Sequence, residues 1–185
     1  GGSLWIGTKN GLNKYIRKSG EIFKYFENNI PGNLSSSEIT ALENGKEDHI
    51  WVGTPIGLHR YHTDTKWFDC YYLINPGLNT AYNDKARITS LLRDSEGRLW
   101  VGTREFGLYI FNQETQQFNN TQNFIPGQQI FSLNSILDII EDNRGLFWIG
   151  TSHKGLAKLI PEPNVFRNYF EGRTIYGIIE PQENI

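Results

Sequence analysis

The sequence Leu-Trp-Val-Gly-Thr at 99–103 constrains this chain more than any other feature, because it occurs four times with conservative changes. The other copies are LWIGT from Leu4, IWVGT from Ile50 and FWIGT from Phe147. Their tryptophans are 46, 49 and 48 residues apart. A period of this length indicates a repeat protein in which each unit packs against its neighbours. We therefore interpret residues 1–185 as a single domain made of one array of repeats.

Each complete repeat begins with an apolar segment, passes a polar turn and then reaches its tryptophan. The first copy enters late and lacks its opening segment. IYGIIEPQENI at 175–185 has the pattern of a truncated opening segment of a fifth repeat. The repeats begin near residues 4, 39, 88 and 136.

Short apolar runs rich in Val, Ile and aromatic residues alternate with turn residues, which predicts β-strands throughout. In the third repeat, Asp94 to Gly97 and Asn112 to Thr115 predict hairpin turns, because Asp and Asn fold back on their own backbone. The second repeat departs, with Asn44 and Asp48 where Asp and Gly are expected. The strands predicted for the third repeat are 88–93, 99–103, 108–112 and 117–121.

The strands carry apolar residues on both alternations, so both faces of each small sheet need a cover. Small four-stranded antiparallel sheets packed face to face around an axis form a β-propeller, and the fold class is therefore all-β. Trp100 and Gly102 project to the same face of their strand. We expect the indole to fill the space between neighbouring blades, with the glycine leaving room for it. The tryptophans assigned to this repeated core are Trp5, Trp51, Trp100 and Trp148.

The segment from Asp94 to Phe118 closely resembles the two-component regulator propeller repeat, found in the extracytoplasmic sensor region of Bacteroides-type hybrid two-component histidine kinases. That family's pattern is roughly Asp, two residues, Gly, one residue, Leu-Trp-Ile-Gly-Thr, a short loop, Gly-Leu and an aromatic strand. The segment from Asp142 to Leu156 fits the same pattern. The resemblance covers nearly the whole chain.

This resemblance implies a membrane-anchored parent with a periplasmic propeller region, a histidine kinase and a response regulator, which responds to carbohydrate breakdown products. It also implies a ring of about seven blades, of which four repeats form an arc, although closed four-bladed rings exist. An arc exposes the faces of its end blades. We therefore expect contact with a second copy or with further blades.

Composition mainly excludes other classes. The net charge is -2, with 18 basic and 20 acidic residues, so no surface that would neutralise nucleic-acid phosphates is indicated. The sequence has no methionine, which predicts a piece excised from a longer protein. Cys70 is the only cysteine, so no internal disulfide is expected.

The candidates for metal binding or catalysis have structural explanations. His59 and His62 are three residues apart on a predicted strand, so they point to opposite faces and fit one metal poorly. Asp94 and Asp142 belong to a repeated turn, where a carboxylate accepts hydrogen bonds from backbone donors. No phosphate-binding loop, nucleophile elbow or zinc pattern is present in the sequence. We expect no catalytic residue, metal or cofactor.

A ligand site is expected where the sequence varies while the scaffold repeats. In an antiparallel meander, the loop after each repeated threonine lies at the same edge as the long connections between repeats. The mixed charged, amide and aromatic groups of these segments suit a polar ligand such as an oligosaccharide. The candidate ligand-binding residues are Tyr82, Arg87, Arg104, Phe106, Asn134 and His153.

Three functional classes follow from these observations. The first is a non-enzymatic, periplasmic sensor module in which a ligand biases a receptor between two arrangements. The second is a protein-interaction scaffold, and the third is a propeller lyase or hydrolase. The third class needs acid, base or metal groups that converge, and the sequence offers only isolated candidates.

Overall fold

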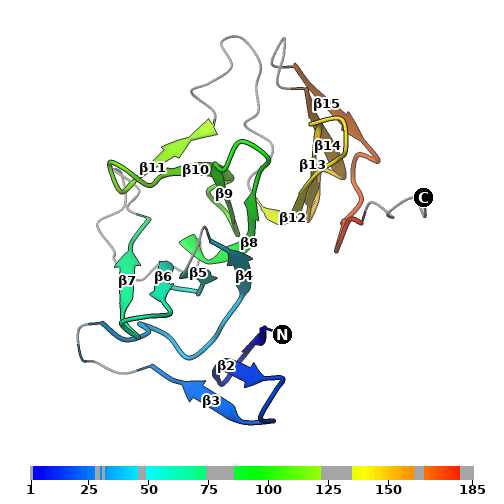
Figure 1. Ribbon diagram of the computed structural model, residues 1–185. Coiled ribbons are helices and arrows are strands. Elements are labelled where there is room, and N and C mark those ends of the chain that lie inside the picture. The colour runs from blue at the N-terminus through cyan, green and yellow to red at the C-terminus, as the bar shows by residue number, and fades with distance from the viewer. Residues whose placement is uncertain are drawn as a thin grey trace. The chain divides into compact units, whose positions relative to one another are not determined.

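The computed structural model describes residues 2–27, 30, 32–45, 49–73, 86–121, 135–160 and 165–179. Every named element in this part of the chain is a β-strand (Figure 1). The chain divides into two compact units, Gly1–Ile88 and Thr89–Ile185. We describe each unit by itself.

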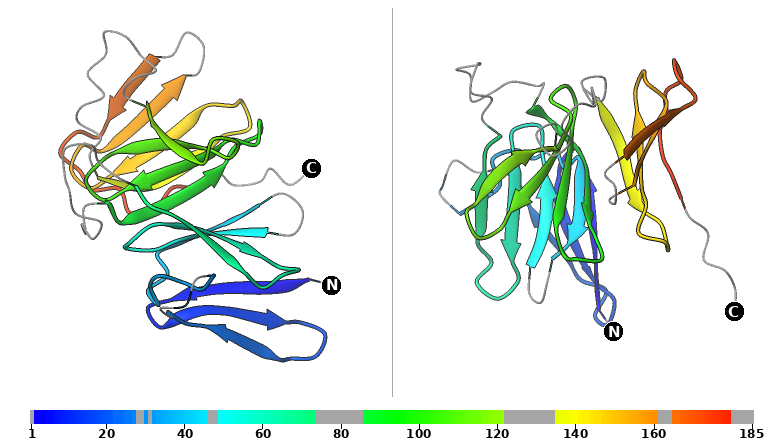
Figure 2. Two further views of the ribbon diagram at one scale, coloured as in Figure 1. Left: turned by 90° about the vertical axis from the view of Figure 1, so that its left-hand side faces the viewer. Right: turned by 90° about the horizontal axis from the view of Figure 1, so that it is seen from above.

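The first unit contains two antiparallel sheets, which we call blades 1 and 2. Blade 1 has three strands in the order β1-β2-β3, and blade 2 has four in the order β4-β5-β6-β7. Figure 2 shows each sheet as a simple up-and-down meander. The strand bounds are β1 Ser3–Thr8, β2 Gly11–Ile16, β3 Ile22–Tyr25, β4 Ala41–Asn44, β5 His49–Gly53, β6 Leu58–His62 and β7 Phe68–Tyr71.

The second unit contains blades 3 and 4, which have four strands each in the orders β8-β9-β10-β11 and β12-β13-β14-β15. Ile88, the first residue of β8, belongs by its contacts to the first unit. The bounds are β8 Ile88–Arg93, β9 Leu99–Thr103, β10 Leu108–Asn112, β11 Gln117–Asn120, β12 Ile136–Glu141, β13 Phe147–Thr151, β14 Leu156–Ile160 and β15 Val165–Tyr169.

The strands predicted for the third repeat are confirmed. Three of them have the observed bounds, and the last ends at Asn120 instead of residue 121. The second predicted turn also forms, because the side-chain oxygen of Asn112 accepts hydrogen bonds from the backbone N–H groups of Glu114 and Thr115 at 2.9 and 2.8 Å. The sequence pattern therefore determines the four-stranded blade.

The first turn of the repeat holds its aspartate against the indole that follows six residues later. Asp94 accepts the backbone N–H of Arg98 at 2.8 Å and the indole Nε1–H of Trp100 at 2.7 Å. Asp142 binds Leu146 and Trp148 in the same way, at 3.0 and 2.9 Å. The predicted turn role of both aspartates is confirmed. Their second role, which is to fix the indole, was not predicted.

These hydrogen bonds change the acidity of the turn carboxylate. Burial opposes ionisation of Asp142. The hydrogen bonds from Trp148, Leu146 and Arg144 outweigh it and lower the pKa of Asp142 to about 2. A carboxylate that accepts several N–H groups is stabilised in its charged form. The carboxylate therefore stays ionised and accepts the hydrogen bond of the indole N–H as an anion.

The second repeat needs a correction at this turn. Gly45, rather than Asn44, is the residue equivalent to the aspartate. Its N–H donates to His49 O at 3.1 Å, and the N–H of Asp94 donates to Arg98 O at 3.0 Å in the same way. The remainder of the turn, 46–48, lies outside the described residues. In this repeat the ring of His49 contacts the indole of Trp51 edge-on, with ring centroids 5.5 Å apart.

Each repeat meets the next through an isoleucine and a glycine. A Cβ atom built on the glycine of the Trp-x-Gly-Thr sequence would lie 2.6 to 2.8 Å from Cγ2 of the isoleucine that opens the following repeat. Real Cβ atoms do not approach this closely, so only glycine fits. The pairs within the first unit are Gly7 with Ile39 and Gly53 with Ile88, and those within the second are Gly102 with Ile136 and Gly150 with Ile175.

The indole and the glycine therefore have separate partners. Trp100 packs on Phe147 of blade 4, with ring centroids 4.6 Å apart, whereas Gly102 makes room for Ile136. The prediction that the indole lies between blades is confirmed here, but the prediction that glycine makes room for the indole is wrong. The glycine position is set by a second contact across the same interface.

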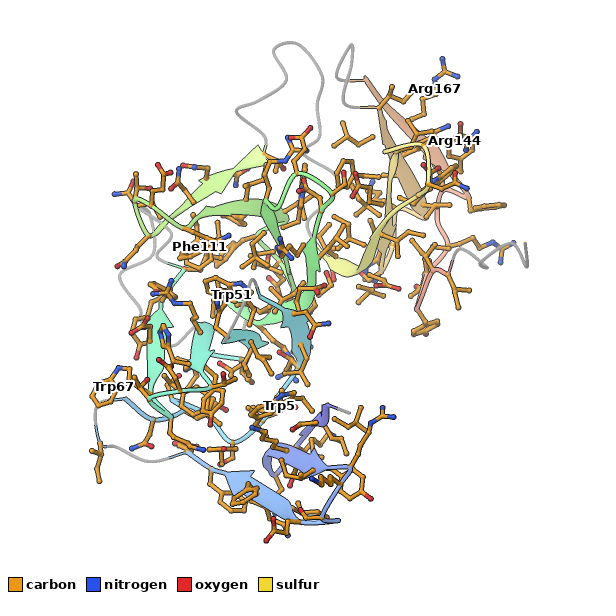
Figure 3. The ribbon with its side chains drawn as sticks, in the orientation of Figure 1. Trp5, Trp51, Trp67, Phe111, Arg144 and Arg167 are labelled. Atoms are coloured by element: carbon orange, nitrogen blue, oxygen red, sulfur yellow. The ribbon has the colours of Figure 1, made fainter. Side chains whose placement is uncertain are left out.

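A matching aromatic core joins blades 1 and 2. Trp5 lies 5.1 Å from Tyr61 by ring centroids, and the hydroxyl oxygens of Tyr25 and Tyr61 are 2.7 Å apart. Figure 3 shows the side chain of Trp5 between the two sheets. Trp51 and Trp100 are buried, while Trp5 and Trp148 are half-buried.

Asp94→Ala should lower the free energy of unfolding by about 1–3 kcal/mol, because it leaves the buried indole N–H of Trp100 without its acceptor. Chemical denaturation with tryptophan fluorescence measures this loss. Glu96→Ala is the matched control, since Glu96 is an exposed acid of the same turn whose ion pair with Arg98 is worth little. Equal losses in the two variants would contradict the role given to Asp94.

Candidate functional site

Each repeated threonine ties down the loop that follows it. The hydroxyl of Thr103 donates to Gly107 O at 2.7 Å and accepts the N–H of Phe106 at 3.1 Å. Thr151 makes the same two bonds, to Gly155 O at 2.9 Å and from the N–H of Lys154 at 2.9 Å. The loops after Thr8 and Thr54 are held in the same way. All four blades therefore present a short loop with a fixed base.

In blades 1, 2 and 4, a close backbone approach requires the glycine that ends the loop. A Cβ on Gly155 would lie 2.2 Å from the carbonyl oxygens of Tyr169 and Phe170, and Gly155 has φ +74. The carbonyl oxygen of Tyr71 lies equally in the way of Gly57, at 2.6 Å. Any side chain here would push the loop away from the outer strand. The position of the loop base is therefore fixed, while the two or three residues between threonine and glycine differ from blade to blade.

The long connections end against these loops. The N–H of Gly11 donates to Ser37 O, and the N–H of Ile39 donates to Thr8 O, at 2.7 and 2.9 Å. The equivalent bonds in the second unit join Gly155 to Arg173 and Ile175 to Thr151, both at 2.9 Å. The predicted meeting of loops and connections at one edge is confirmed within each unit. We call this edge the loop face.

Three of the predicted ligand-binding residues lie on described loops of the second unit. Arg104 is exposed and Phe106 is half-buried on the loop of blade 3. His153 is exposed on the equivalent loop of blade 4, where its Nδ1 lies 2.5 Å from the hydroxyl of Ser152. A guanidinium, a phenyl ring and an imidazole thus occupy equivalent loops of two consecutive blades.

Arg87 occupies a different position, in the first unit. It forms a two-pronged ion pair with Glu38, with N–O distances of 2.6 and 3.2 Å. The hydrogen bonds from Arg87 hold the pKa of Glu38 below its usual value, against the opposing effect of burial. The pair therefore stays charged, and it fixes the geometry of both side chains.

The remaining two candidates, Tyr82 and Asn134, lie outside the described residues. The structure adds Glu38 and Ser152, which contact Arg87 and His153 and which sequence reasoning missed. A signal for Glu38 was present, because Glu38 and Arg87 both stand directly before the isoleucine of their repeat and carry opposite charges.

The two histidines of the second repeat point in different directions, as predicted. Nε2 of His59 lies 2.8 Å from the hydroxyl of Ser35 and accepts a hydrogen bond from the backbone N–H of Ser35 at 3.2 Å. Nε2 of His62 instead lies 2.8 Å from a carboxylate oxygen of Asp69. Among the described residues, no group of three or more His, Cys, Asp or Glu side chains is placed to hold a metal ion. His59 is a buried structural residue that fastens the connection before β4 to β6.

The sequence profile described as "Two component regulator propeller" matches residues 82–105 and 130–153. Both matched segments run from the connection before a repeat, through its tryptophan strand, into the loop after the threonine. These two segments are thus similar to the repeat that the profile describes. Five of the six candidate ligand-binding residues lie in the matched segments of these repeats, and Phe106 follows the first one directly.

Solved structures with the same fold include extracellular domains of putative hybrid two component systems. The chain is 25% identical to the extracellular domain of the putative hybrid two component system BT3049 from B. thetaiotaomicron, with a TM-score of 0.70 over 89% of this chain and 21% of that one. It is 24% identical to the corresponding domain of BT4673 from the same organism, with a TM-score of 0.79 over 99% of this chain and 24% of that one. This chain therefore spans less than a quarter of the length of either domain.

The fold is shared with proteins of other kinds as well. Virginiamycin B lyase from Staphylococcus aureus is 16% identical, with a TM-score of 0.66 over 91% of this chain and 52% of that one. At this identity the likeness shows the fold alone. None of the curated protein sequences compared with the chain matches it.

The buried His59 makes a pH prediction. Burial lowers the pKa of His59 to about 4, whereas the ordinary value is 6.5. Between pH 6.5 and 4 the unfolded chain binds more protons, so stability is full above this window and falls as the pH drops through it. The loss from this group should reach about 3 kcal/mol.

Urea denaturation of the natural chain and of His59→Gln at several pH values measures this contribution. The difference in unfolding free energy between the two proteins should shrink as the pH falls from 6.5 to 4. A constant difference across the window would show that His59 is not held neutral in the folded state.

Proposed function

We propose that this chain is a non-enzymatic, ligand-recognising part of the extracytoplasmic region of a hybrid two-component signalling receptor. The observation that carries the proposal is the likeness of nearly the entire chain to extracellular domains of such systems, together with the matched propeller repeats. The described residues contain no helix that is long and apolar enough to cross a membrane. In this proposal the membrane anchor, kinase and response regulator belong to the parent protein, and the propeller lies in the periplasm.

The loop face supports recognition of a polar ligand, and we propose an oligosaccharide. Each loop has a base fixed by a threonine and a glycine, so its exposed residues are positioned before a ligand arrives. Arg104 and His153 offer hydrogen-bonding groups, and Phe106 offers an aromatic ring. Sugar hydroxyls need such donors and acceptors, while the apolar face of a sugar ring packs on an aromatic side chain.

In this proposal the propeller transmits a signal by binding alone. A ligand shifts a receptor between two arrangements only to the extent that it binds one of them more tightly. Loops from consecutive repeats suit this task, because a ligand that spans two loops stabilises one spacing between them. The likeness to virginiamycin B lyase shows the fold alone and does not support a lyase reaction here.

The test is isothermal titration of the chain with a panel of neutral, acidic and sulfated oligosaccharides. A panel member should bind, and Arg104→Ala combined with His153→Ala should weaken it by about tenfold or more, the equivalent of 1.4 kcal/mol in lost contacts. Both side chains are exposed, so the melting temperature should stay within a few degrees of that of the natural chain.

Glu114→Ala is the control for this titration, since Glu114 is exposed in the turn between β10 and β11, at the opposite end of these strands. Its affinity should equal that of the natural chain. Binding that survives in the double variant would remove Arg104 and His153 from the site. Failure of the whole panel to bind would contradict the proposal that the ligand is an oligosaccharide.

A further inference from the structure

Trp67, in the turn between β6 and β7, carries an indole that lies outside the core of the first unit. It is 48% exposed, whereas Trp51 of the same blade is 0% exposed. Figure 3 shows Trp67 beside the outer strand of blade 2, apart from Trp5 and Trp51. A single exposed aromatic residue is common on protein surfaces and indicates nothing by itself. The position and the packing of Trp67 are what distinguish it.

The same turn forms in two other blades with a polar residue at this position. The backbone N–H of His62 donates to Trp67 O at 2.9 Å, and the N–H of Ile16 donates to Glu21 O at 2.9 Å in the same way. In blade 3 the strand register puts Gln117 at the equivalent place. Glu21 and Gln117 are both exposed. The turn therefore forms without an aromatic side chain, so the turn does not explain the indole.

One face of the indole packs against a glycine. A Cβ atom built on Gly32 would lie 2.5, 2.3 and 2.4 Å from Cδ2, Cε3 and Cζ3, three consecutive atoms of the six-membered ring of Trp67. Such similar distances place that point over the face of the ring, because a point beside the edge would be much nearer to the middle atom. The backbone of Gly32 thus covers one face of the ring, and the exposed part of the side chain includes the opposite face.

Hydrogen bonds hold both sides of this contact in place. Gly32 has φ +87, which glycine adopts readily, and its carbonyl oxygen accepts the N–H of Phe68 at 2.9 Å. On the other side, the N–H of Lys66 donates to His62 O at 2.9 Å and closes the turn that precedes Trp67. The indole is thus a flat surface that is positioned before a ligand arrives, which lowers the entropic cost of binding.

The surface around the indole is mainly polar. Asp64, Thr65 and Lys66 of the same turn are exposed, and Ile30 adds apolar surface near Gly32. A protein interface of ordinary size buries about 800 Å² on each partner and has few charged residues at its centre. One indole face beside charged and hydroxyl side chains instead matches a single sugar ring. The C–H groups of the sugar pack on the indole, while its hydroxyls meet the polar groups.

We propose that Trp67 and Gly32 form a carbohydrate-binding site, in which one pyranose ring of an oligosaccharide stacks on the exposed face of the indole. Gly32 is the positioning residue, and the exposed residues of the turn bind the sugar hydroxyls. Sugars with a continuous C–H face, such as β-linked glucose or galactose, fit this surface. The site is separate from the loop face of the first unit, because Trp67 follows the end of β6 that lies away from Gly57. The inference therefore does not depend on binding at the loop face.

Isothermal titration of the full chain with soluble cello-, galacto- and xylo-oligosaccharides tests the proposal. At least one of them should bind, and Trp67→Gln should weaken that binding about tenfold or more. This variant copies the residue of blade 3, so its circular dichroism spectrum should match that of the natural chain.

Phe23→Gln is the matched control for the lost aromatic ring, since Phe23 is 49% exposed on another strand of the same unit. Its affinity should equal that of the natural chain. The proposal is overturned if none of the three kinds of oligosaccharide binds, or if the two glutamine variants bind equally well.

Gly32→Ala tests the position of the ring separately from its presence. The new Cβ atom would occupy the space of the ring, so affinity should fall although Trp67 is intact. Gly20→Ala is the control for backbone strain, because Gly20 has φ +75 and a Cβ atom there meets nothing within 4 Å. This control should bind as the natural chain does. Equal affinities of the two alanine variants would remove Gly32 from the site.

Protection from oxidation separates this site from the loop face. N-bromosuccinimide oxidises exposed indoles, and Trp67 is the exposed one of the five tryptophans, all of which lie in the described part of the chain. A saturating amount of the bound oligosaccharide should slow the oxidation of Trp67, measured by mass spectrometry of its peptide. Binding by calorimetry with no protection of Trp67 would leave the loop face as the site and overturn this one.

Discussion

The packing of an isoleucine against a glycine between successive repeats is the constraint on which the rest of this structure depends. The glycine of each Trp-x-Gly-Thr strand has no side chain, and the isoleucine that opens the next repeat fills that space. The backbone N–H of Ile39, Ile88 or Ile175 then donates to the carbonyl of the threonine that follows the glycine. Within each unit, one residue pair therefore sets both the distance between consecutive sheets and the position where the next sheet begins. In a repeat protein, such nearest-neighbour contacts supply much of the stability.

The same short sequence also prepares the loop face. The tryptophan of the strand packs between blades, the glycine receives the isoleucine, and the threonine ties down the loop. Because the strand residues make these structural contacts, the residues between threonine and glycine are not needed for them. Arg104 and His153 occupy such positions. A rigid scaffold that presents variable loops is a common basis for recognition.

The sequence was sufficient to predict the strands and their antiparallel order, because alternation, turn residues and the repeat period act locally. It was insufficient for contacts between side chains of different strands and for contacts between repeats. The bond from Asp94 to the indole of Trp100, and the approach of Ile136 to Gly102, depend on how two strands or two sheets come together. The candidate site shows the same division. The loop positions followed from topology, but Arg87 and Glu38 are 49 positions apart, and their opposite charges at equivalent positions were the only sequence signal for their pairing.

A double-mutant cycle on Gly53 and Ile88 tests the central claim most directly. Gly53→Ala would place a Cβ atom 2.6 Å from Cγ2 of Ile88, so it should destabilise the chain by about 1–3 kcal/mol in chemical denaturation. In the Ile88→Ala background that atom is absent, and Gly53→Ala should cost much less, which gives a coupling energy of about 1 kcal/mol or more. The same cost in both backgrounds would show that the isoleucine does not determine the need for glycine, and would contradict the proposed joint between repeats.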